Sequence, residues 1–124
     1  MTTVRILTAA LAISLLAACS STPKEPYTFK ARKVTIITEP PGAQVMQYRP
    51  FGLKSEDLGV TPIIEREVLI LTNVDRSARV NWNEALDHAS NLVVLVRKDG
   101  YRSRKMKLAI KGFDTNEFTI QLGR

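Results

Sequence analysis

Short runs of aliphatic and β-branched residues recur from position 34 onwards, and they predict strands. Six runs are found, at 34–38, 43–48, 68–72, 91–96, 105–110 and 117–122. The run NLVVLV at 91–96 is apolar on both faces, so we expect a central or covered strand there. The last two runs alternate, which directs the following apolar side chains to the core: Met106, Leu108, Ile110, Phe118, Ile120 and Leu122.

Turn signals separate these runs. Prolines and a glycine at 40–42 end the first run, and Asp99-Gly100 predicts a hairpin turn. The segment PFGLKSEDLGVTP at 50–62 carries two glycines and two prolines, which predicts a loop.

One segment has a helical period instead. In NWNEALDHAS at 81–90, Trp82, Ala85, Leu86 and Ala89 are spaced as one stripe of a helix. Asn81, three residues before Glu84, is typical of a capping box. We expect a short helix that packs Trp82 and Leu86 on the sheet.

Together these patterns predict a mainly β fold over residues 33–124. We expect a small, antiparallel, β-sandwich-like module with one short inserted helix. The strand order around the insertion at 63–90 is left open.

The N-terminus has the layout of a secretory signal peptide. Arg5 precedes the run ILTAALAISLLAA at 6–18, which ends in small residues. A membrane span needs about 20 apolar residues, more than this run provides. We therefore expect residues 1–18 to be cleaved.

The stretch LAAC at 16–19 contains the single cysteine of the chain. It resembles the lipobox of bacterial lipoproteins. That resemblance implies a diacylglycerol on the thiol of Cys19, cleavage just before Cys19 and acylation of the new amine, with palmitate a typical chain. Ser20 is similar to the residue found in outer-membrane lipoproteins. A lipidated thiol needs no disulfide partner, and two or more acyl chains anchor stably where one does not.

Length and composition allow one small domain behind this anchor. Removing 18 of the 124 residues leaves 106, and losing Arg5 lowers the formal charge from +6 to +5. The segment SSTPKEPYTFKAR at 20–32 has two prolines and no apolar period, so we expect residues 19–32 to form the lipidated cysteine and a flexible tether.

Three motifs within 33–122 resemble a PEGA domain. They are VTIITEPPGAQV at 34–45, Gly59-Val60-Thr61-Pro62, and Asp99-Gly100-Tyr101. The resemblance implies a small β module of exported or envelope proteins with binding or structural roles, and it brings no catalytic residues. The chain departs from the pattern by a proline at the second turn position and by the long segment between Pro62 and Gly100.

The residue types that catalysis needs are sparse. His88 is the only histidine, and we expect it to be a solvated helix residue near Glu84. Ser77, Ser90 and Asp87 occur in no nucleophile motif, and Glu56-Asp57 is too short for a calcium loop. We expect no enzyme activity, no metal and no cofactor beyond the lipid on Cys19.

Charge is unevenly distributed. Between 97 and 111, seven cations face one acid, Asp99, which gives an excess of +6 and leaves the rest of the mature chain near −1. The cations are Arg97, Lys98, Arg102, Arg104, Lys105, Lys107 and Lys111. A solvated edge that resists aggregation is one explanation, and a surface for an anionic partner is the other.

The sequence therefore predicts a lipid-anchored protein of the cell envelope, in the outer membrane and facing the periplasm. We expect a non-catalytic binding or scaffolding role towards an anionic cell-wall, lipid or protein partner, with no nucleic acid. An accessory protein-binding subunit of an envelope machine and a small hydrolase are the alternatives.

Overall fold

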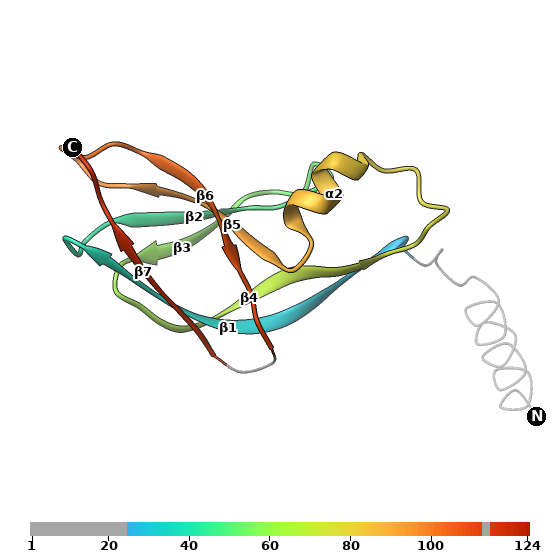
Figure 1. The fold of residues 1–124 in the computed structure, drawn as a ribbon, viewed down its shortest axis with the longest axis horizontal. Coiled ribbons are helices and arrows are strands. Elements are labelled where there is room, and N and C mark those ends of the chain that lie inside the picture. The colour runs from blue at the N-terminus through green and yellow to red at the C-terminus, as the bar shows by residue number, and fades with distance from the viewer. Residues whose placement is uncertain (1–24, 113–114) are drawn as a thin grey trace, which may run out of the picture.

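Two β-sheets form the structure, a computed structural model that describes residues 25–112 and 115–124 (Figure 1). The strands are β1 (Tyr27–Glu39), β2 (Gln44–Tyr48), β3 (Glu56–Val60), β4 (Ile63–Val74), β5 (Asn91–Arg97), β6 (Arg104–Ala109) and β7 (Asn116–Gln121), and the helix is α2 (Trp82–His88). The prediction of a mainly β, sandwich-like module with one short helix is confirmed. The expected signal peptide and Cys19 lie outside the described residues.

The first sheet has the order β4-β1-β7. Its long strand β1 pairs antiparallel with β4 and parallel with β7. The expectation of an antiparallel module therefore holds except for this one pair. The parallel pair arises because β7 follows β6 of the other sheet and crosses to β1, instead of returning beside its neighbour in sequence.

The second sheet has the order β3-β2-β5-β6, with every pair antiparallel. Strand β5 lies between β2 and β6, so the central position expected from its apolar run is confirmed. The β5–β6 hairpin expected at Asp99-Gly100 is also confirmed.

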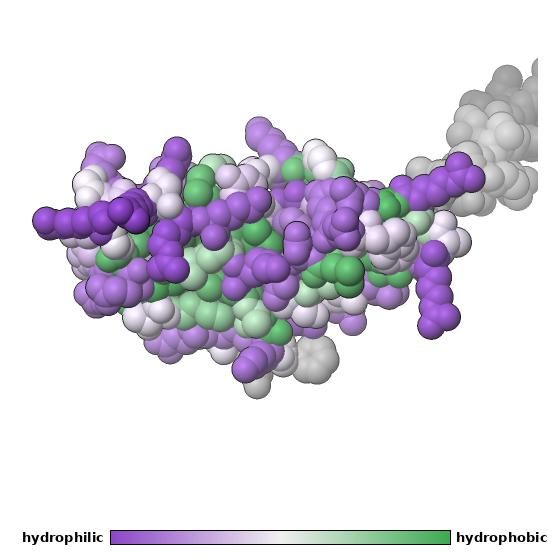
Figure 2. Space-filling view, turned by 45° about the horizontal axis from the view of Figure 1, so that its top comes forward, coloured by the Kyte–Doolittle hydropathy of each residue, from purple (hydrophilic) through white to green (hydrophobic). Residues whose placement is uncertain are grey.

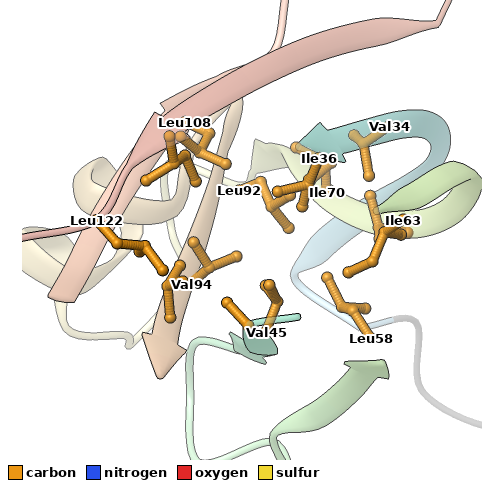
Figure 3. Close-up of a cluster of buried hydrophobic side chains, with 14 residues drawn as sticks. Val34, Ile36, Val45, Leu58, Ile63, Ile70, Leu92, Val94, Leu108 and Leu122 are labelled. Carbon is orange, nitrogen blue, oxygen red and sulfur yellow. The ribbon is translucent and has the colours of Figure 1, made fainter. Parts of the chain in front are cut away.

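The core lies between the two sheets (Figure 3). Alternate side chains of β5, Leu92, Val94 and Val96, are fully buried in this core. Figure 3 shows Leu92 pointing towards Ile36 and Ile70 of the other sheet. The predicted inward parity of the last two strands is confirmed. Leu108, Ile120 and Leu122 are buried, and Met106, Ile110 and Phe118 pack partly buried against the same core.

Strand β1 begins at Tyr27, six residues before the expected domain boundary, so the expectation that residues 27–32 belong to a tether is wrong. These residues pair with β4 from Val68 to Val74. They lack an apolar period because this part of β1 extends past the core. Its aromatic rings pack instead on one another and on Phe51.

The expected loop at 50–62 contains a strand, β3. Only Leu58 of this strand is buried, and Glu56, Asp57 and Gly59 are poor strand formers. The strand forms because it is the edge of its sheet, where pairing with β2 is sufficient and a bulge opposite Val45 and Met46 accommodates the irregular sequence.

Helix α2 begins after Asn81, whose side-chain oxygen accepts a hydrogen bond from the Glu84 N–H at 3.2 Å. The N-cap expected at Asn81 is therefore present, whereas the Glu84 carboxylate, expected to complete a capping box, accepts the Phe51 N–H. Its expected packing is wrong: Ala85 is buried, whereas Trp82 is 43% and Leu86 71% exposed. The small Ala85 lets the helix approach the sheet closely, and this leaves the two larger side chains at the surface.

Candidate functional site

Three turns meet at one end of the sandwich, and they contain the three motifs singled out in the sequence. The turn at 40–43 and the segment at 59–62 are joined through Thr61, which is 4% exposed. Its hydroxyl oxygen accepts hydrogen bonds from the N–H groups of Gly42 (3.2 Å) and Ala43 (3.0 Å). The backbone adds a bond from Thr61 N–H to the Ala43 carbonyl at 2.8 Å.

The proton of the Thr61 hydroxyl also has an assigned partner. The Thr38 hydroxyl donates to the Pro40 carbonyl at 2.9 Å, so in the contact between the two hydroxyls it is Thr61 that donates to Thr38. Every hydrogen-bonding position of the Thr61 hydroxyl is thus occupied. This arrangement fixes the two motifs to each other and to the end of β1.

The third turn, 98–103, lies beside them. Gly42 has φ +92°, and a Cβ atom added there would lie 3.0 Å from the Lys98 ammonium nitrogen. The positive φ at this position favours glycine, and with a larger residue the Lys98 ammonium, at the end of a flexible side chain, would have to shift slightly away. A pocket of about 550 Å³ opens at this junction and is lined by Gly42, Gln44, Val60, Arg97, Lys98, Asp99, Gly100, Tyr101 and Ser103.

Four of the seven predicted cations lie around this junction, and we call Arg97, Lys98, Arg102 and Arg104 the basic turn. Arg97 lies opposite Gln44 on the outer face of its sheet, and the Arg104 guanidinium donates to the Gln121 carbonyl at 3.1 Å. The Arg102 N–H donates to the Gly123 carbonyl at 2.8 Å, which holds the C-terminal residues beside the turn. In Figure 2 hydrophilic side chains project from this end, at the left.

The other three cations lie elsewhere. The Lys105 ammonium lies 4.6 Å from the centre of the Tyr48 ring, and Lys107 forms an ion pair with Asp87 at 3.2 Å. Both are exposed on the outer face of β6, opposite to the inward face predicted for Met106 and Leu108. Lys111 follows the far end of β6, where its N–H donates to the Asn116 side chain at 2.8 Å. The structure therefore divides the predicted set and brings together only the basic turn.

Ion pairing separates the two groups as well. Over the described residues two ion pairs are found, Arg66 with Glu56 and Lys107 with Asp87. Lys107 is thus the only one of the seven cations that is paired with a carboxylate of the described part of the chain. The four cations of the basic turn form no ion pair among the described residues.

His88 lies in a second pocket with Asp87, Val93, Lys105, Met106 and Lys107. Burial lowers the pKa of His88 below its usual value, and Lys105 lowers it further, whereas Glu84 and Asp87 oppose the shift. The carboxylate of Glu84 accepts the Phe51 N–H at 2.8 Å. Neither Ser77 nor Ser90 is among the residues that line this pocket.

The acidic residues of β3 have structural partners. Glu56 pairs with Arg66, and the Asp57 carboxylate accepts the N–H of Gly59 at 2.9 Å. No group of three or more potential metal ligands is found among the described residues. A search of the same residues for a helix with the length and apolarity of a membrane span also finds none.

Comparisons of the chain with protein families, with curated proteins and with solved structures return no match.

Two features of this end of the molecule were not predicted from the sequence. The Arg124 guanidinium lies 5.4 Å from the centre of the Tyr101 ring, which adds a fifth cation beside the basic turn. Thr61 was recognised within its motif, but its bonds to Gly42 and Ala43 join segments almost twenty residues apart. The alternating strands could have placed the C-terminus near the hairpin, but no local signal indicates the threonine bridge.

Proposed function

We propose that the protein is a lipoprotein with a PEGA-like domain, anchored in the outer membrane through lipid on Cys19 and facing the periplasm. It acts without catalysis, as a binding or scaffolding protein. The basic turn binds an anionic component of the envelope, and the unpaired cations gathered at the junction of three turns are the observation that carries this proposal.

The placement of the two ends supports this role. The described part of the chain begins just before β1. This point lies at one end of the sandwich, and the 98–103 turn and the C-terminus lie at the other (Figure 1). A strand of 13 residues has a contour length of about 40 Å. This is several times the Debye length of about 8 Å at physiological ionic strength. A basic turn at this distance is directed at a partner other than the lipids around its own anchor.

The chemistry of the junction favours a carboxylate or phosphate group. Arg97 and Lys98 flank a polar pocket, and a guanidinium can bind both oxygens of such a group at once. Arg102 and Arg104 extend the positive field beyond the pocket, which favours a polymer or an extended acidic surface over a single small ion. Cell-wall carboxylates and an acidic protein face share this chemistry.

Binding of the purified protein to isolated envelope fragments tests the proposal. We expect binding at low salt that weakens steeply as ionic strength rises, because the Debye length falls to about 3 Å at 1 M. The double variant Arg97→Glu, Arg102→Glu should lose binding while its melting temperature stays unchanged, since both side chains are exposed.

The matched control is Lys30→Glu, Lys33→Glu, which makes the same change of charge at two exposed positions of β1. Equal losses in both double variants would show that net charge alone matters and would refute a site at the basic turn. Recovery of a defined protein instead of wall material in the bound fraction would assign the accessory-subunit role.

A further inference from the structure

The end of the sandwich opposite the basic turn carries a second distinctive surface, which we call the aromatic end: Tyr27, Phe29, Phe51, Trp82 and Leu86. The Tyr27 ring lies 5.5 Å from Phe29 and 4.9 Å from Phe51, measured between centroids. The Phe51 N–H donates to Glu84 of α2, so these rings and the helix belong to one surface.

Helix α2 contributes apolar side chains that the protein leaves in water. Trp82 is 43% and Leu86 71% exposed, and a groove of about 190 Å³ lies between them and the end of β4. The groove is lined largely by apolar side chains, including Leu71, Val74 and Ala85. Monomeric proteins rarely expose several large apolar side chains at one place unless that surface binds a partner or a membrane.

The loop between β4 and α2 adds positive charge at the same end. Arg76 and Arg79 are exposed there, and the Asp75 N–H donates to the Pro26 carbonyl at 2.7 Å. This bond ties the loop to the residue just before β1, and Figure 1 shows the yellow loop reaching the blue start of that strand. The loop, the helix and the start of the domain therefore share one end.

The position of Cys19 limits how far this end can lie from a membrane. Six residue steps separate Cys19 from Glu25, the first described residue. Even a fully extended chain spans at most about 20–22 Å over that length. If Cys19 carries lipid, the aromatic end is the part of the domain held closest to the bilayer.

The chemistry of the aromatic end fits a bilayer surface. Tryptophan and tyrosine favour the headgroup region, where an apolar ring and a polar edge are both accommodated. Leu86 can enter the adjoining acyl region, and exposed arginines bind lipid phosphates.

We propose that the aromatic end docks on the lipid bilayer that holds the anchor, with Trp82 and Leu86 in its interfacial layer. This inference rests on the proposed lipid anchor. Docking adds a second point of attachment, so the domain stands upright on the membrane. The basic turn is then presented at the far end, towards its anionic partner.

Trp82 is the only tryptophan in the chain, so its fluorescence reports on this surface alone. The purified lipidated protein is reconstituted into vesicles of phosphatidylethanolamine and phosphatidylglycerol, with and without bromine on the acyl chains. We expect emission shifted to shorter wavelength in plain vesicles and reduced in intensity in brominated ones.

Leu86→Glu should reverse both changes, because it places a charge in the interfacial layer. The matched control is Ile64→Glu, at a similarly exposed apolar position near the start of β4, and it should leave both changes intact. Loss of both changes in the control as well would show a general effect of added negative charge and would overturn the docking surface.

Mass spectrometry of the N-terminal peptide separates the two proposals. If Cys19 carries lipid but bromine leaves Trp82 emission unchanged, docking is overturned and the anchor stands. A shift to shorter wavelength without quenching would show that protein covers Trp82, which also overturns docking. A Cys19 thiol without lipid would overturn both.

Discussion

Replacement of Thr61 by valine tests whether the threonine bridge holds the three-turn junction together. Valine keeps the shape of the side chain, so no cavity forms and only the hydroxyl is lost. Gly42 N–H retains a partner, the Thr61 carbonyl at 3.1 Å. Ala43 N–H, in a residue that is 0% exposed, loses the Thr61 hydroxyl as its acceptor.

The expected cost follows from these bonds. A buried donor left without a partner costs about 1–3 kcal/mol, and the lost bond to Thr38 adds about 0.5–1.5 kcal/mol. We expect the free energy of unfolding to fall by about 2–4 kcal/mol. For a domain of about 100 residues this lowers the melting temperature by roughly 10–20 °C.

Thermal and urea unfolding, followed by circular dichroism, measure this loss. Thr61→Ser keeps the hydroxyl and should retain most of the stability that valine loses. Thr119→Val is the matched control at an exposed strand position, where a change within about 0.5 kcal/mol is expected. If Thr61→Val melts like Thr119→Val, the bridge does not stabilise the junction and the reasoning is wrong.

Three further changes test the core, the helix and the pH response. Leu108→Ala should destabilise by about 2–5 kcal/mol in urea unfolding, because the side chain is buried in the core; unchanged unfolding would show that β6 faces the other way. Asn81→Ala should cost about 1 kcal/mol through the lost cap of α2, and Asn81→Asp, which can still accept the bond, should restore it. Because burial lowers the pKa of His88, the unfolded chain binds the proton first, and stability is lost as pH falls below about 6.5. His88→Gln should remove this loss between pH 7 and 5 in melting curves, and an unaltered pH profile would contradict the assignment.

The strands that fill the core could be predicted because their apolar period is set by burial itself. The alternation of apolar and polar residues predicts that Leu108, Ile120 and Leu122 face the core, and all three are buried. Strand β3 and the start of β1 escaped prediction because they are stabilised by pairing and by contacts between aromatic rings outside the core. Neither strand pairing nor ring contacts outside the core produce an apolar period in the sequence.

The candidate site likewise has features that the sequence predicts and features that only the structure shows. A cluster of cations between 97 and 111 is visible in the sequence. Only the structure places Lys98 beside Gly42, with Arg97 in the lining of the same pocket, and puts Lys111 beyond the far end of β6. The helix period at Trp82 and Leu86 predicted a buried stripe. The structure buries Ala85 alone, because the sheet already has its core on the other face.

Photo-crosslinking in intact cells can show whether the basic turn binds an anionic partner. A photoreactive residue at Ser103, which lines the pocket, should form adducts with an anionic envelope component. The same residue at the exposed Thr119 of β7 should form few. Arg97→Glu with Arg102→Glu should abolish the adducts at 103. Adducts at 103 that persist in this double variant, or that are no more frequent than those at 119, would contradict it.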